Sequence, residues 1–252
     1  MLNMKTIIEE FKMKSLSGNT IKIIAIIAMI IDHVGWAFVN ENTVVGVIIH
    51  TIGKITGPIM CYFIAEGNHY SKNLSKYVER LAIFALISHV PYNIFVNQGK
   101  ITLIPTSVIF TLMCGLLALI VFQKIENKPI KSILIVLLVA ITYWADWAIF
   151  GVLFVLVFGI FYGDFKKQMI AFVILNFCKV FYYALFVDGV SNYYMMVPRV
   201  LSTILFVLIL SLYNGTKGGS KYSKWTFYII YPLQFLIIGG IALLFEKFKN
   251  QG

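Results

Sequence analysis

The chain has 252 residues, of which 60% are hydrophobic and only 13% carry a charge, and its mean hydropathy is +0.85. Soluble domains are nearer half apolar and a quarter charged, so this composition excludes an ordinary soluble protein and predicts a polytopic membrane protein. The formal net charge of +10 does not indicate binding to nucleic acid. Most of the lysines fall in short links between apolar runs, where they orient membrane helices.

Nine apolar segments predict an all-α bundle of about nine transmembrane helices, forming a single domain over residues 1–252. Most segments are close to the roughly 20 residues that a helix needs to cross a bilayer. The fifth and sixth are short, and either a tilted hairpin or a broken helix would fit them. We favour the hairpin, because it keeps Lys166 and Lys167 on the same side as the other cationic links. The predicted spans are residues 20–39, 44–66, 77–97, 103–123, 130–144, 147–162, 167–187, 194–213 and 225–245.

The lysines alternate between the links and so predict the orientation of the chain. The positive-inside rule gives a cytoplasmic amino terminus and, with nine spans, an external carboxyl terminus. Residues 1–14 are expected to form a short cytoplasmic surface helix. Cys61, Cys114 and Cys178 each stand alone on an apolar segment, so we predict packing residues and no disulfide or metal site.

Three ionisable side chains lie on the first predicted span, namely Lys22, Asp32 and His33. An ionisable residue inside a membrane span is costly, so it is by default a hypothesis of function. At about 100° and 1.5 Å per residue, Lys22 and His33 share a helix face, about 20° apart and separated by roughly 16 Å of depth. Such a face would suit a long anionic molecule with a reactive end.

Polar residues on four spans are predicted to lie at a similar depth. Counted from the outer ends of their spans, Asp32 and His33 lie about 9–11 Å inside, and the others about 12–15 Å. Unpaired charges are not tolerated there, so we expect mutual pairing or a water-filled cavity. Arg199 lies nearer the outer surface. The other members of this layer are Lys54, His89 and Lys179.

A second polar group, Lys22, Glu66 and Arg80, lies near the predicted cytoplasmic ends of the first three spans. Each member also has a purely structural interpretation. Lys22 and Arg80 would reach the headgroups by extending their side chains, and Glu66 would pair with Arg80.

Structural interpretations also exist for the outer layer. Asp32 would pair with Lys54 and fix helix packing, His50 would sit at the outer interface, and His89 fits either a structural or a functional role. Because successive residues on a helix point about 100° apart, Asp32 is not expected to orient His33 directly. We expect Ser88, His89 or Asp146 to do so.

The chain resembles the TraX family of F-pilin acetylase-like proteins, within the transmembrane acyltransferase superfamily. The spacing Lys22-x10-His33 is similar to the Arg/Lys-x10-His signature of that superfamily. The resemblance extends along most of the chain, and the order of the motifs carries it. These motifs include Asp32-His33-Val34-Gly35, Ile52-Gly53-Lys54-Ile55, Pro91-Tyr92, Phe110-Thr111-Leu112, Ala145-Asp146-Trp147, Gly151-Val152-Leu153 and Tyr231-Pro232-Leu233.

The resemblance implies an acyltransferase in a bacterial-type cytoplasmic membrane that takes acetyl groups from cytoplasmic acetyl-CoA. The acceptor would be an amine or hydroxyl of a peptide, a glycan or a lipid-linked molecule. His33 is the expected catalytic residue, as base or acyl carrier, with Asp32 beside it. Lys22, Arg80 and Lys54 are expected to bind coenzyme A. Further candidates are His89, Glu66, Asp146 and Lys179.

Two positions depart from the family pattern. Lys54 stands where arginine is expected, which keeps the charge but loses the bidentate fork. Gln234 stands where relatives often carry a histidine.

Two other classes of function fit the same residues. A proton-coupled transporter or flippase would use intramembrane Asp, His and Lys as a proton relay. An inactive scaffold would bind a lipid or a peptide. Binding of coenzyme A would separate the acyltransferase from both.

Overall fold

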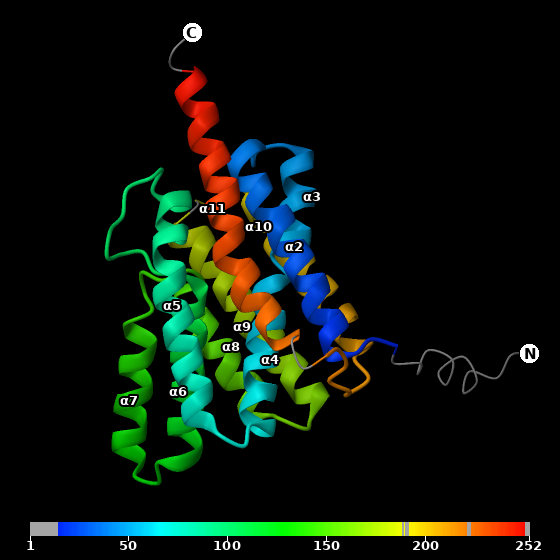
Figure 1. The fold of residues 1–252 in the computed structure, drawn as a ribbon. Coiled ribbons are helices and arrows are strands. Elements are labelled where there is room, and N and C mark those ends of the chain that lie inside the picture. Colours follow the sequence, from blue (N-terminus) through cyan, green and yellow to red (C-terminus); the bar gives the residue numbers. More distant parts are fainter. Residues whose placement is uncertain (1–14, 188, 190–191, 221–222, 250–252) are drawn as a thin grey trace, which may run out of the picture.

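The structure is a computed structural model, which describes residues 15–187, 189, 192–220 and 223–249. In this part of the chain every regular element is a helix, so the predicted all-α bundle is confirmed (Figure 1). The surface helix predicted for residues 1–14 lies outside the described residues. The helices are α2 (Gly18–Phe38), α3 (Val44–Gly53), α4 (Thr56–Tyr70), α5 (Leu74–Val96), α6 (Val108–Lys124), α7 (Lys128–Ala140), α8 (Ala148–Ile160), α9 (Phe165–Phe186), α10 (Tyr193–Ser211) and α11 (Ser223–Lys249).

Several of these helices are long and apolar enough to cross a membrane. Five spans of at least 18 residues meet that description, and α3 and α4 together make one of them, Val44–Tyr70. The helices α6 and α8 are shorter apolar helices of 17 and 13 residues. The protein is therefore a multi-pass helical membrane protein.

The structure differs from the predicted spans at two places and decides between the two alternatives for the fifth and sixth spans. The second span is broken at Lys54 and Ile55, where the backbone N–H of Lys54 still donates to the carbonyl of His50 at 3.0 Å. The fourth span begins at Val108 rather than residue 103, because Thr102 and its neighbours bond to Asn93 and form a loop. The short fifth and sixth spans are α7 and α8, two packed helices joined by a turn, as the favoured hairpin requires.

Aromatic side chains hold the centre of the bundle together. Phe154, Phe158, Phe172 and Phe206 are all fully buried, and the Phe172 and Phe206 rings lie 4.5 Å apart between α9 and α10. Lipid tails are as apolar as these side chains, so close packing rather than exclusion of water drives the association of such helices. These rings fix how α8, α9 and α10 sit against one another.

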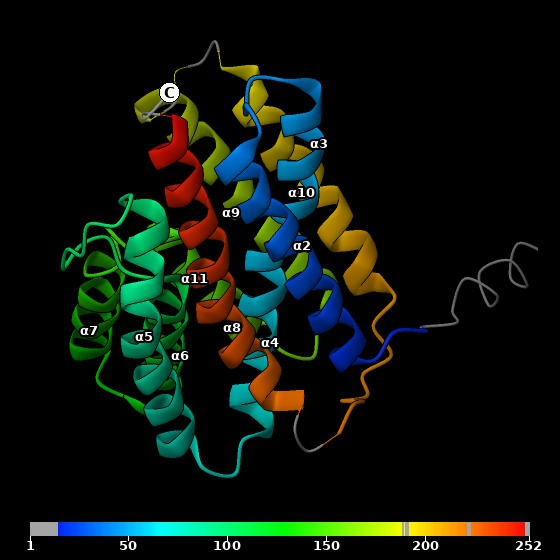
Figure 2. The ribbon, with the colours of Figure 1, turned by 45° about the horizontal axis from the view of Figure 1, so that its top comes forward.

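The ends of the helices do not lie at one level. The upper ends of α6, α7 and α8 stop well below those of α2 and α3 (Figures 1 and 2). The loop before α6 and the turn before α8 are joined there, since the N–H of Asp146 donates to the carbonyl of Thr106 at 2.9 Å. Two connecting segments therefore lie inside the height of the bundle and help to line the site described below.

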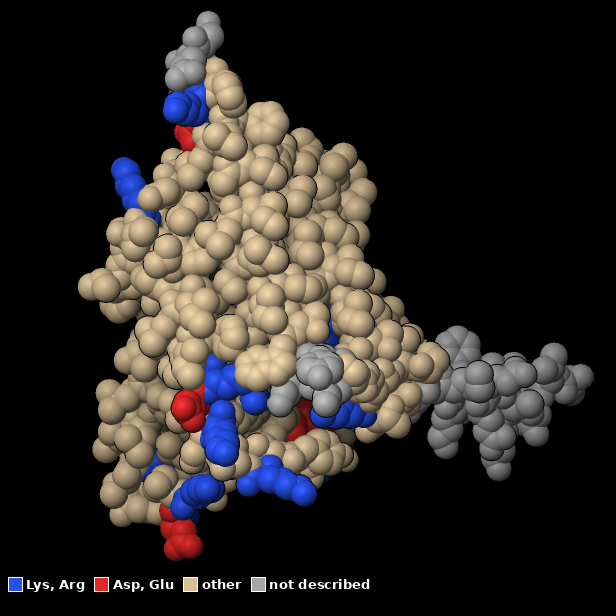
Figure 3. Space-filling view, viewed as in Figure 1, with Lys and Arg blue, Asp and Glu red and all other residues tan. Residues whose placement is uncertain are grey.

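Charge is distributed unequally between the two ends of the molecule. In Figure 3, lysine and arginine gather mainly at the lower end, and the middle band is almost free of charge. The lysines at this end flank the start of α5, the link between α6 and α7, the start of α9 and the link after α10. From this distribution the positive-inside rule predicts that the lower end is the cytoplasmic one.

Cysteine labelling tests this orientation. In a Cys178→Ser background, which removes the exposed native thiol, we expect a membrane-impermeant maleimide to label Asn42→Cys in intact cells. Glu126→Cys, on the α6–α7 link, should be labelled only after permeabilisation. The reverse pattern would contradict the assigned orientation.

Candidate functional site

A cavity of about 920 Å³ opens at the end of the bundle opposite the lysine-rich end. It lies among α2, α5, α9, α10 and α11, beside the break after α3 and the turn before α8. Its volume is within the range of about 300–1,000 Å³ typical of ligand sites. Six residues singled out from the sequence line it, namely Asp32, His33, Lys54, Asp146, Lys179 and Arg199.

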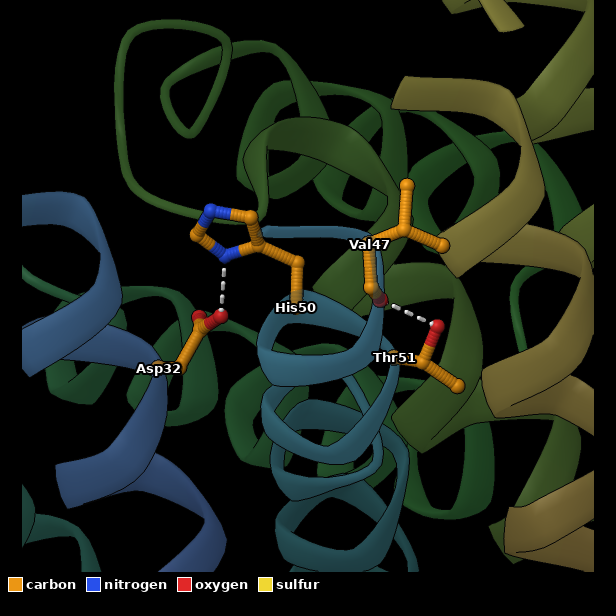
Figure 4. A network of polar contacts seen from close by, with 4 residues as sticks. All are labelled: Asp32, Val47, His50 and Thr51. Carbon is orange, nitrogen blue, oxygen red and sulfur yellow. Dashed lines mark hydrogen bonds and ion pairs between the residues drawn. The ribbon is translucent and has the colours of Figure 1, made fainter. Parts of the chain in front are cut away.

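The carboxylate of Asp32 is held by a histidine from the neighbouring helix. Asp32 Oδ1 and His50 Nδ1 lie 2.7 Å apart, and the two side chains face each other across α2 and α3 (Figure 4). His50 is only 1% exposed, so our prediction that it lies at the outer interface is wrong. Gly53 allows this burial, because a Cβ at that position would overlap the Asp32 side chain.

Asp32 was expected to pair with Lys54, and the structure gives it His50 as a hydrogen-bond partner. Trp36 covers this contact, with its ring centroid 4.5 Å from that of His50. The ammonium of Lys54 lies 5.5 Å from the Trp36 ring, a cation–π contact. The cavity wall therefore carries the Asp32 carboxylate, the Lys54 ammonium and the Trp36 ring, and His50 supports Asp32 without lining the cavity.

The imidazole of His33 lies between helices α5 and α11. Its ring centroid is 4.5 Å from that of Phe235 and 5.6 Å from that of Phe95. Among the described residues, His33 Nδ1 is buried without a hydrogen-bond partner. The Gln234 amide interacts with this imidazole, but both of its polar atoms also lack a hydrogen bond within the same part of the chain. Two phenylalanine rings and the Gln234 amide therefore surround the imidazole.

Of the three residues expected to orient His33, Asp146 lines the cavity with it, and Ser88 and His89 do not. His89 Nε2 lies 2.8 Å from the carbonyl of Thr102 and ties α5 to the following loop. The Ser88 hydroxyl is buried without a hydrogen bond in the described part of the chain. His89 does not line the cavity. The sequence predicts that His89 and His33 lie at a similar depth, but a similar depth does not place both side chains in one site.

Aromatic rings also accompany the remaining cations of the cavity. The Lys179 ammonium lies 3.8 Å from the centroid of Trp147, and the Arg199 guanidinium carbon lies 4.5 Å from that of Tyr183. Trp147 has a left-handed backbone, with φ of 65°, which is rare for a bulky residue and marks a strained position. Its ring packs onto Gly57, where a Cβ would overlap it.

The backbone of Asp146 is fixed on both sides. Its N–H donates to Thr106, and its carbonyl accepts from the Thr111 hydroxyl at 2.6 Å. The carboxyl group interacts electrostatically with Lys179 and Lys54. Asp146 therefore supplies a negative charge to a cavity wall that carries three cations.

The second polar group lies outside this cavity. The Lys22 ammonium sits 4.4 Å from the Phe63 ring, and Glu66 accepts a 2.7 Å hydrogen bond from the Tyr213 hydroxyl. The Arg80 guanidinium packs on the rings of Tyr77, Trp225 and Tyr228. The predicted pairing of Glu66 with Arg80 is therefore wrong. Glu66 is bonded to a tyrosine hydroxyl, and Arg80 packs against aromatic rings.

The face between Lys22 and His33 is closed by packed side chains. Ile26 and Met29 share that face at helical spacing and are 5% and 4% exposed. The face that the sequence predicts to suit a long anionic molecule is therefore covered by neighbouring helices at these two positions.

Histidine, cysteine and carboxylate side chains do not form a metal-binding group of three anywhere in the described residues.

Comparison with known proteins identifies similar chains. The model of a family described as TraX protein matches residues 17–242. A protein of Dichelobacter nodosus described as "Probable fimbrial assembly protein FimC, serogroup H1" is 29% identical over 235 residues, covering 88% of this chain and 94% of that protein. No solved structure matches the chain.

The contact between Asp32 and His50 predicts a specific loss of stability. His50→Leu leaves the Asp32 carboxylate without this partner, and removing one member of a buried pair typically costs about 3–5 kcal/mol. We expect a clearly lowered melting temperature of the detergent-solubilised protein, and partial recovery in the double variant Asp32→Asn/His50→Leu. His69→Leu is the matched control, because His69 is exposed and stacks on Tyr162. Equal effects of the two single leucine variants would contradict the assignment.

Proposed function

The chain belongs to the TraX family, and from that premise we propose that it is a membrane-embedded acyltransferase. The reaction moves an acetyl group from acetyl-CoA to an amine or hydroxyl of a membrane-associated or external acceptor. One observation carries the proposal. An imidazole, that of His33, lines a cavity of ligand size within the membrane-spanning bundle, together with Asp32, Lys54 and Asp146.

His33 and His50 have different surroundings, and this difference supports a different role for each. His50 is hydrogen-bonded to Asp32, its Nε2 is buried, and it does not line the cavity. His33 does line the cavity and has no carboxylate bonded to it in the described residues. We therefore assign catalysis to His33 and positioning of the Asp32 carboxylate to His50.

The chemistry requires a base and a donor for developing negative charge. His33 removes the proton from the acceptor amine or hydroxyl as the new C–N or C–O bond forms. The C–S bond of the thioester then breaks, and the imidazolium returns its proton to the departing thiolate of coenzyme A. The negative charge that develops on the thioester oxygen requires a donor from the cavity wall.

The route of the donor is constrained by packing. We retain Lys22 and Arg80 as candidates to meet the phosphates of coenzyme A at the lysine-rich, proposed cytoplasmic end. Ile26 and Met29 are buried between Lys22 and His33, so entry of the pantetheine arm from that end requires them to move. Acetyl transfer from the cytoplasm therefore depends on a second arrangement of α2 and its neighbours.

The acceptor is proposed to approach from the end where the cavity opens. The D. nodosus relative is described as a probable fimbrial assembly protein. That description supports an acceptor of this chain, peptide or glycan, that is handled at the outer face of a bacterial cytoplasmic membrane. We propose the same membrane and an external opening for this chain.

A second candidate function is a proton-coupled transporter or flippase. The break between α3 and α4 favours it, because a discontinuous helix with a charged residue facing a cavity is common at transporter binding sites. Such a protein would bind its substrate without consuming acetyl-CoA.

Turnover of labelled acetyl-CoA by the purified full chain tests the acyltransferase. His33→Ala should lower the rate by about 10²–10⁴, the usual contribution of a general base. His89→Ala is the control, since it removes an imidazole that lies outside the cavity, and it should leave the rate within a few-fold of the original.

Equal loss in the two variants would contradict the role of His33. Absence of any acetyl-CoA turnover or binding in the unmodified protein would favour the transporter.

A further inference from the structure

The cavity has one strongly cationic wall and one mainly apolar wall. Lys54, Lys179 and Arg199 come from the α3–α4 break, α9 and α10 and meet on one side. The three side chains lie near one another, since all of them also line a second, smaller hollow. The carboxylates of Asp32 and Asp146 line the same cavity.

A smaller hollow continues from this wall and adds polar groups. Its lining includes the same three cations together with Asn176, Ser202 and Thr203. The Asn176 amide donates to the Thr203 hydroxyl at 2.6 Å, and Thr203 in turn donates to the Arg199 carbonyl at 2.9 Å. These bonds fix the backbone that carries Arg199. The cationic wall is thus a supported arrangement of side chains from three separate segments.

A second wall comes from α5 and α11 and is mainly apolar. It includes Ile94, Phe95 and Val96 of α5 and Gly239, Ala242 and Leu243 of α11, and it also carries two polar side chains, Gln98 and Glu246. Val96 is 43% exposed, so this wall reaches the surface of the bundle. A molecule in the cavity would therefore meet cationic side chains on one wall and mainly apolar side chains on the other.

We propose that the cavity binds a membrane amphiphile through a phosphate or diphosphate headgroup held by Lys54, Lys179 and Arg199. The hydrocarbon chain of this molecule lies along α5 and α11. Arginine offers a fork that matches phosphate oxygens, and the two lysines act as point charges. The attraction between such an anion and these side chains is stronger in a medium of low dielectric constant than in water.

This inference rests on the proposed function, and it names the class of acceptor as a lipid-borne phosphate. The cavity opens at the end opposite the lysine-rich end, so a cytoplasmic nucleotide does not reach the cations without the rearrangement described above. A lipid-linked acceptor is anchored in the bilayer and reaches the same wall from the side. Its headgroup then stands next to His33, which shares the cavity.

Binding of decyl phosphate to the purified full chain in maltoside detergent tests the proposal without acetyl-CoA. We expect saturable binding, with Kd raised at least about tenfold in Lys54→Gln and in Arg199→Gln, because each change removes a charge-assisted contact. Lys54→Arg keeps the charge and should retain binding, which separates loss of the contact from loss of the fold. Lys100→Gln is the matched control, since Lys100 is an exposed cation in the loop before α6.

Three results would overturn the proposal. The first is an unchanged Kd in both glutamine variants. The second is binding of a control ligand as tightly as decyl phosphate. Equal binding of inorganic pyrophosphate would show that the hydrocarbon chain is not recognised, and equal binding of decyltrimethylammonium would show that the anionic headgroup is not recognised. The third is tight binding of coenzyme A that the same variants abolish, which would assign the cations to the donor. None of these results depends on acetyl transfer, so failure here is distinguishable from failure of the catalytic role of His33.

Discussion

The contact between Asp32 and His50 is the interaction on which the site depends. A carboxylate inside a bilayer is tolerated only with a partner, and here the partner comes from the helix packed against α2. Gly53 and Gly35 bring α3 close enough to α2 for the contact to form, since side chains at either position would collide. The same packing sets Lys54 at the end of α3, facing the cavity.

Several other features follow from this arrangement. The span breaks after Gly53, and the Thr56 hydroxyl then donates to the Ala25 carbonyl, so α4 stays attached to α2 beyond the break. Trp147 fills the space beside Gly57 and carries the Lys179 ammonium on its face. Charged groups from α2, α3, α9 and the α7–α8 turn thus converge because small residues let the helices approach one another. The residues that pack these helices together therefore also position the charged groups of the site.

The fold was accessible from the sequence to a greater extent than the site. Hydropathy runs give the spans, because a bilayer demands continuous apolar segments, and the starts of α2, α3 and α7 fall within two residues of the prediction. The loop before α6 was missed because its hydrogen bonds to Asn93 are not a local pattern. The sequence predicts that Asp32, Lys54 and Lys179 lie in one layer, because residues at a similar depth on neighbouring helices can meet. The burial of His50 and the separation of Arg80 depend on helix rotation and packing, which depth does not determine, although Gly35 and Gly53 were a signal for close approach.

The most direct measurement is an electron cryomicroscopy map of the full chain in lipid nanodiscs with a non-hydrolysable thioether analogue of acetyl-CoA. The account predicts that the sulfur and acetyl carbon of the analogue lie next to the His33 imidazole, with Ile26 and Met29 displaced from the face that they now close. Density for the analogue remote from His33, with that face still packed, would contradict the assignment of acyl transfer to this cavity.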